Sequence, residues 1–258
     1  ATTEIYTLSL HDALPILMGE LVPQLIDLAR RAKAYDLNFT VDAEEADRLE
    51  LSLDVIAAAF ADPSLAGWSG FGLAIQAYQK RATDVIDYID ALTRALDRRM
   101  MVRLVKGANL AMEQVEAELH HWPQAPYETK AEVDASYLRC VERALRPDAV
   151  AAGVRIGVAS HNLYDLAAAH LLAEQRGVTA SVDVEMLQGM SPAQARAVRD
   201  TVGTVILYTP VVDPADFDAA VSYLVRRLEE NAAPENFLHA FFAEGDPAAM
   251  PEQERRFR

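Results

Sequence analysis

Short uninterrupted apolar segments alternate along the chain with longer segments of helical periodicity, and this pattern predicts alternating strands and helices. The predicted strands are Leu37–Val41, Phe71–Tyr78, Met100–Val105, Val154–Ala159, Thr179–Met186 and Val202–Leu207. The predicted helices are Leu17–Ala34, Ala43–Phe60, Asp84–Leu96, two within Ala108–Leu145, Leu163–Gln175, a short one after Ser191-Pro192, and one from Asp213-Pro214 to Asn231. One helix followed by six strand–helix units is typical of an α/β protein with a parallel sheet.

The predicted strands lack polar–apolar alternation, which indicates burial on both faces of the sheet. No glycine-rich phosphate fingerprint follows the strands, so a β/α barrel is favoured over a doubly wound sheet. A closed (β/α)8 TIM barrel needs eight units, and the chain supplies six. We therefore predict a barrel fragment that lacks the first two strands.

The first sixteen residues, ATTEIYTLSLHDALPI, do not fit this pattern and resemble a translated sequencing adapter. We therefore divide the chain into a non-native extension, 1–16, and a barrel fragment, 17–258. A genuine N-terminal extension is the alternative interpretation of the first segment.

Composition narrows the functional classes. Of the 258 residues, 51% are apolar and 24% are charged, which suffices for a sizeable core. The net charge of −15 argues against binding to nucleic acid, because such a surface repels phosphate backbones. A single cysteine, Cys140, excludes an internal disulfide, and no apolar segment approaches the ~20 residues of a membrane-spanning helix.

Polar side chains follow the predicted strands, at the end of a barrel where catalysis takes place. They are Asp42, Gln76, Arg103, Lys106-Gly107-Ala108, Ser160-His161-Asn162, Glu185 and Tyr208, with Arg226, Arg227 and Glu230 on the last helix. Several have a purely structural interpretation. Asp42 suits a helix cap and Arg103 a buried ion pair, whereas Lys106 suits a solvated loop and His161 a turn. The two arginines of the last helix suit a solvated face.

Their combination favours an anionic cofactor and a zwitterionic substrate, because arginine binds carboxylates with two parallel hydrogen bonds. Gly107 would let the backbone approach such a ligand closely. A metal-dependent barrel hydrolase using His161, Asp42 and Glu185 is an alternative. It is disfavoured because His161 is the only histidine at a predicted strand end. We therefore expect no metal.

Six ordered motifs carry a family resemblance: FTVDAEEADRLELSLDVI, GFGLAIQAYQKRATDVIDYI, MVRLVKGA, GVASHN, EMLQGM and LYTPV followed by YLVRRLEENAAPENF. Together they resemble the proline dehydrogenase domain of the bifunctional bacterial proline utilization flavoenzymes. The resemblance runs from about Leu17 to Phe237. It implies a distorted TIM barrel that binds FAD and oxidises L-proline to Δ1-pyrroline-5-carboxylate, with hydride passing from proline C5 to flavin N5.

The resemblance also implies a role for each matching residue. Arg103, Lys106, Gly107 and Ala108 would lie along the flavin and its phosphates, with Arg103 near N5. Gln76 would contact the isoalloxazine ring, His161 and Asn162 the pyrophosphate or ribityl region, and Thr129 and Lys130 the adenosine part. Asp42 would organise the cationic groups. Leu187 and Tyr208 would pack on the proline ring, while Arg226 and Arg227 would bind its carboxylate, with Glu230 paired to one of them.

The partners implied by the resemblance are L-proline, a quinone as electron acceptor, and a fused or separate aldehyde dehydrogenase. The expected location is the cytoplasm, with peripheral contact to the inner face of the bacterial membrane. Asn109 departs from the family pattern, where tyrosine commonly follows KGA, and a substrate-binding lysine of the second strand is missing. We therefore expect this chain to be impaired by truncation. A non-catalytic flavin-binding remnant is the third hypothesis.

Overall fold

The structure is a computed structural model that describes residues 10–234, 236–243 and 248–258, without the side chains of 10–14, 226 and 229–231. The strands are β1 (Phe39–Val41), β2 (Phe71–Gln76), β3 (Met100–Val105), β4 (Val154–Ala159), β5 (Val182–Leu187) and β6 (Val205–Tyr208). The helices are α1 (Leu10–Ala34), α2 (Leu49–Ala61), α3 (Ala82–Leu96), α4 (Leu110–His120), α5 (Lys130–Ala144), α6 (Pro147–Ala152), α7 (Leu163–Arg176), α8 (Pro192–Val202), α9 (Phe217–Ala232), α10 (Phe237–Phe242) and α11 (Ala249–Phe257). No helix among these residues is long and apolar enough to cross a membrane.

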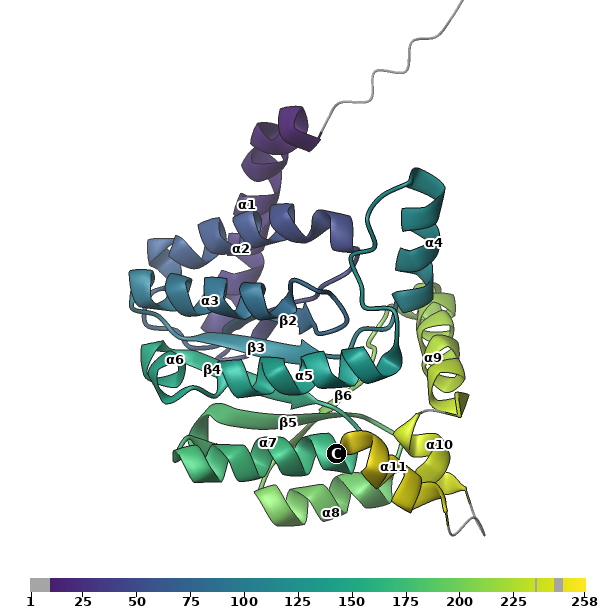
Figure 1. The fold of residues 1–258 in the computed structure, drawn as a ribbon. Coiled ribbons are helices and arrows are strands. Elements are labelled where there is room, and N and C mark those ends of the chain that lie inside the picture. Colours follow the sequence, from purple (N-terminus) through teal and green to yellow (C-terminus); the bar gives the residue numbers. More distant parts are fainter. Residues whose placement is uncertain (1–9, 235, 244–247) are drawn as a thin grey trace, which may run out of the picture.

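The six strands form one parallel sheet in the order β1-β2-β3-β4-β5-β6. Spatial order therefore follows chain order without the reversal that defines a doubly wound sheet. The sheet curls into a half-barrel, and helices α2, α3, α5, α7 and α8 cover its outer face (Figure 1). The prediction of a partial (β/α)8 barrel is confirmed.

Several predicted boundaries were wrong. The first helix begins at Leu10 and not at Leu17. A 3-10 turn occupies Ala46–Arg48, so α2 begins only at Leu49. The predicted strand Val202–Leu207 begins at Val205, because α8 continues through Val202 and ends at Gly203, whose φ is +91°. Three short helices, α6, α10 and α11, were not predicted, because none is long enough to show clear periodicity.

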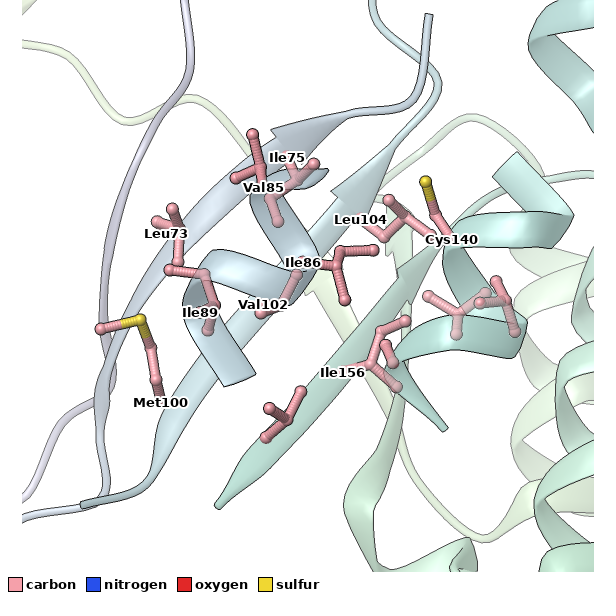
Figure 2. Packing of buried hydrophobic residues seen from close by; sticks show 14 of the residues in the cluster. Leu73, Ile75, Val85, Ile86, Ile89, Met100, Val102, Leu104, Cys140 and Ile156 are labelled. Carbon is pink, nitrogen blue, oxygen red and sulfur yellow. The ribbon is translucent and has the colours of Figure 1, made fainter. Parts of the chain in front are cut away.

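The hydrophobic core lies between the sheet and its outer helices. Figure 2 shows Leu73 and Ile75 of β2 and Val102 and Leu104 of β3 facing Ile86 of α3. Cys140 of α5 belongs to the same cluster and is fully buried. Because successive strand residues point to opposite faces, the residues between these core positions line the concave side of the half-barrel. That alternation determines where the site can form.

Candidate functional site

Strand alternation places the strand residues of the predicted site on the concave face. Val184 and Met186 of β5 point into the outer core, so Glu185 and Leu187 point inward. The same argument places Gln76 and Arg103 on that face, since their strand neighbours pack outward, and Tyr208 lies there because its ring contacts the Arg103 guanidinium. In Figure 1 the arrowheads of β2 and β3 point toward the end of the sheet where α4, α9 and α10 gather. The carboxyl end of the sheet is thus where these polar groups are brought together.

Arg103 is the central cation of this face. Its Nε donates a hydrogen bond to Glu185 Oε2 at 2.6 Å, and its guanidinium carbon lies 5.1 Å from the centre of the Tyr208 ring. The Arg103 side chain is 21% exposed, whereas that of Glu185 is 6% exposed. Glu185 is the only hydrogen-bond partner of Arg103 in the described part of the chain. The remaining guanidinium N–H groups are therefore available to a ligand at the rim.

Helix α9 extends this cluster. The Tyr208 and Tyr223 rings lie 6.1 Å apart, and the Arg227 guanidinium carbon lies 4.8 Å from the centre of the Tyr223 ring. Burial and the charges of Tyr223 and Asp42 raise the pKa of Tyr208, while Arg103 and Arg227 oppose this increase. Exposed Asp42, at the end of β1, thus influences the same ring as Arg103 of β3 and the two residues of α9. Its Oδ1 accepts a hydrogen bond from the N–H of Ala43 and caps no helix.

Two predicted residues of α9 cannot be placed. Arg226 and Glu230 belong to α9, but their side chains lie outside the described residues. Leu187, in contrast, is placed at the end of β5, where its N–H donates to Nε2 of His161 at 3.0 Å. The carboxylate-binding role of Arg226, and its pairing with Glu230, stay predictions.

Lys106 is neither solvated nor free to face a phosphate. Its Nζ pairs with Asp134 of α5 and lies 2.8 Å from Oδ2 of Asp165 in α7, whose side chain is 2% exposed. Lys130 pairs with the same Asp134. Asp165 also accepts a hydrogen bond from Ser160 Oγ at 2.9 Å. The cluster of Lys106, Lys130, Asp134 and Asp165 therefore balances its charges and joins the loops that follow β3 and β4.

Gly107 has a packing role in this structure. Its φ is +109°, and a Cβ atom there would lie 1.8 Å from Cδ1 of the buried Tyr78 ring. Ala108, the next residue of the KGA motif, is exposed. Gln76 is buried and donates to the carbonyl of Ala43 at 3.1 Å, while it accepts from Gln79 Nε2 at 2.9 Å. The Gly107–Tyr78 contact packs the loop after β2 against the loop after β3, and the Gln76–Ala43 hydrogen bond joins the end of β2 to the loop after β1.

His161 is held as a neutral side chain. Its Nε2 accepts from the Leu187 N–H, so its proton lies on Nδ1, 3.4 Å from Oε1 of Gln194. Burial lowers the pKa of His161, and the contact with Gln194 opposes that effect. Asn162 caps α7 by accepting from the N–H of Tyr164 at 2.9 Å. His161 and Asn162 thus have the structural role of a turn that leads into α7, and they lie next to the carboxyl end of β5.

We expect the free energy of unfolding to fall as the pH drops below 6.5. The folded protein lowers the pKa of His161 from 6.5, so the unfolded chain takes up this proton first. The stabilisation is present above that pH and is lost as the pH falls through the lowered pKa. Denaturant unfolding between pH 7.5 and 5 measures the effect, and His161→Gln, which cannot titrate, should make the dependence shallower. An unchanged slope would exclude His161 as its source.

Thr129 and Lys130 begin α5. Thr129 and Glu132 form a reciprocal capping box, in which the Thr129 side chain accepts from the Glu132 N–H and the Glu132 side chain accepts from the Thr129 N–H. The Thr129 hydroxyl also donates to Glu132 Oε2 at 2.9 Å. The predicted contact of these residues with an adenosine group stays a prediction.

The donor set of this site suits an anionic ligand better than a metal. Within the described ranges no group of three or more histidine, cysteine, aspartate or glutamate residues could hold a metal ion. Glu185 is paired with Arg103, and Nε2 of His161 already accepts a backbone hydrogen bond, so neither is available as the metal-dependent hydrolase hypothesis requires.

Sequence reasoning missed three partners in the site. The sequence predicts Glu185 as a polar residue at a strand end and as a candidate metal ligand but not as the partner of Arg103, and it predicts no role for Asp134 or Asp165. A signal was present for the aspartates, because a lysine placed directly after a buried strand needs an anionic partner. For Glu185 the signal was the unexplained arginine inside an apolar strand.

Comparisons with known proteins identify the family. The sequence profile of the family described as proline dehydrogenase matches residues 3–240. Relatives named bifunctional protein PutA, from Klebsiella aerogenes and Rhizobium meliloti, are each 39% identical over 229 and 232 residues. These alignments cover 86% of this chain but only 17% and 18% of the relatives, so the chain spans less than a fifth of their length.

Solved structures agree with the sequence matches. Proline utilization A (PutA) of Bradyrhizobium japonicum superimposes with a TM-score of 0.84 at 45% identity, over 95% of this chain and 24% of that one. The Bdellovibrio bacteriovorus protein superimposes with a TM-score of 0.86 at 28% identity, over 95% and 25% of the two chains. The resemblance seen in the six motifs is confirmed, and the chain belongs to the proline dehydrogenase family.

Proposed function

We propose that this domain oxidises L-proline to Δ1-pyrroline-5-carboxylate with FAD as its cofactor. The observation that carries the proposal is the cationic cluster at the carboxyl end of the sheet. There Arg103 and Arg227 lie on either side of the contacting rings of Tyr208 and Tyr223. One cation would serve the flavin and the other the substrate carboxylate. The family assignment supports the same reaction.

The residues of the concave face fit a flavin. Arg103 presents guanidinium N–H groups that have no partner in the described part of the chain, and its Nε is fixed by Glu185. Buried Gln79 has an amide oxygen, Oε1, without a hydrogen-bond donor, beside the Gln76 assigned to the isoalloxazine ring. Lys106 fits less well as a phosphate ligand, because two aspartates already neutralise it. We therefore assign Arg103 and Gln76 to the flavin ring and regard Lys106 as an anchor of the loop.

Bound FAD would supply the acceptor for the hydride that leaves proline C5, and the proposed final electron acceptor is a quinone. The arginines of α9 would bind the proline carboxylate and thereby orient C5. Tyr208 and Leu187 would pack on the ring of the substrate. The proline amine must be neutral for its lone pair to assist the departure of hydride, and we assign the released proton to water.

The wider setting is also part of the proposal. The relatives carry the name bifunctional protein, and an aldehyde dehydrogenase, fused or separate, would convert the product further. A cytoplasmic location with peripheral contact to the membrane stays a prediction, as do the assignment of residues 1–16 to an adapter and the absence of two strands. A non-catalytic flavin-binding remnant is the second candidate, favoured by Asn109.

Anaerobic addition of L-proline to the FAD-loaded chain tests the proposal. The visible flavin absorption should bleach, and a chain extended by the two expected strand–helix units should bleach faster. A bound flavin that stays oxidised in both chains would indicate the non-catalytic remnant.

Arg227→Met should raise the KM for proline by about 30-fold or more, since truncating one partner of a buried charge pair costs about 2–5 kcal/mol. Arg199→Met is the control, because Arg199 is 56% exposed and pairs with its neighbour Asp200 on α8. An unchanged KM in the Arg227 variant would exclude its role in binding the carboxylate.

A further inference from the structure

A buried ion pair passes across β4 on the concave face. Arg103 belongs to β3 and Glu185 to β5, so β4 runs between the two strands. The side chains nevertheless meet at 2.6 Å, and the Glu185 side chain is 6% exposed. Because burial of a carboxylate is costly without a partner, this contact fixes both side chains.

Gly157 of β4 makes the crossing possible. It lies opposite Arg103 in the register of β3 and β4, and Ala159, two residues further, lies opposite Glu185. A Cβ atom at Gly157 would come within 2.2 Å of Glu185 Oε1. A residue with any side chain would therefore force the Glu185 carboxylate to shift from its position beside Arg103. Arg103, Gly157 and Glu185 thus form one structural unit, although they come from three strands.

We propose that Glu185 is a positioning residue that fixes Arg103 toward the bound flavin and offsets its charge, so that it sets the reduction potential of the flavin. This inference rests on the proposed function, which assigns Arg103 to the flavin ring. The carboxylate holds Nε and directs the remaining N–H groups toward the rim. Its negative charge, nearly excluded from water, weakens the attraction that Arg103 exerts on the reduced flavin.

Glu185→Gln removes the negative charge of this side chain while it keeps the side chain's shape. The glutamine oxygen can still accept from Arg103 Nε, but the negative charge is gone. Reduction of the bound flavin should then become at least tenfold more favourable, which for a two-electron couple is about 30 mV toward positive potential. Titration of the FAD-loaded chain with dithionite and reference dyes measures this shift. Asp183→Asn is the matched control. Asp183 lies on β5, two residues before Glu185, and pairs with a different arginine, Arg155 of β4, at 2.6 Å.

Two further variants keep the inference testable even if E185Q does not retain flavin. In an Arg103→Met background, E185Q should produce a smaller shift, since the part of the effect that depends on the position of Arg103 is lost. Gly157→Ala displaces the carboxylate without altering Glu185 and should shift the potential in the same direction; it carries the test if E185Q does not retain flavin. Equal potentials in wild type and the variant that retains flavin, or an equal shift in D183N, would overturn the inference alone. A wild-type chain that binds no FAD would overturn the proposed function together with it.

Discussion

Asp165→Asn should lower the free energy of unfolding by about 3 kcal/mol or more, since breaking a buried ion pair costs about 3–5 kcal/mol. The Asp165 side chain is 2% exposed. It forms an ion pair with Lys106 Nζ and accepts a hydrogen bond from Ser160 Oγ. Asparagine keeps the shape but leaves the cluster of Lys106, Lys130, Asp134 and Asp165 with an excess positive charge. The loop after β3 and the loop after β4 should loosen together, because this carboxylate is their shared anchor.

The pH dependence of this loss identifies its source. Burial alone would lower the pKa of Lys106, but the charges of Asp165 and Asp134 outweigh burial and raise it above 10.5. The stabilisation is therefore fully present below pH 10.5 and is lost as the pH rises through the raised pKa. Urea unfolding of wild type and variant should give the full difference at pH 7 and a smaller one at strongly alkaline pH.

Asp148→Asn is the control for an ordinary ion pair. Asp148 is 64% exposed and lies 3.0 Å from Arg94, so its loss should cost at most about 1 kcal/mol. A cost for D165N as small as that for D148N would show that Lys106 finds another partner. It would return Lys106 to the ligand role that the family resemblance implies.

The strands could be predicted from the sequence because their apolar segments are short and bounded by polar residues. Met100–Val105 and Val154–Ala159 agree with the predicted bounds. The predicted boundaries were wrong where a helix continues beyond the segment of helical periodicity. Exclusion of the first sixteen residues set the predicted helix start at Leu17, yet the backbone is helical from Leu10.

The concave-face residues could also be predicted, since alternation along each strand determines which face a side chain occupies. Arg103, Leu187 and Tyr208 follow this rule. Beyond the end of a strand, alternation no longer determines where a side chain points. The contacts of residues in the loops were therefore not predicted. Lys106, one residue past β3, turns to the aspartates of α5 and α7.

Partners distant in the sequence were the least predictable part of the site. Glu185 follows Arg103 by 82 residues, and only the register of β3, β4 and β5 brings them together. The role of Gly157 depends on the same register. Sequence alone showed that Arg103 needed a partner without identifying it.

Gly107→Ala should lower the free energy of unfolding by roughly 2–5 kcal/mol. A positive φ costs a residue with a Cβ about 1–2 kcal/mol, and overpacking typically costs about 1–3 kcal/mol more. The new methyl group would lie 1.8 Å from Cδ1 of Tyr78. That ring cannot easily move, because Tyr78 is 1% exposed, its N–H donates to the Lys106 carbonyl at 2.8 Å, and its hydroxyl lies 3.3 Å from Glu113 Oε1.

Two comparisons separate the causes of this loss. Gly177 has a φ of +68° with open space around it, so Gly177→Ala should show the conformational cost alone. In a Tyr78→Ala background the cost of G107A should fall to the same level, because the clash is removed. Chemical denaturation of the four variants measures both differences. If G107A costs as much without the Tyr78 ring, the glycine is needed for its backbone conformation alone and not for its packing against Tyr78.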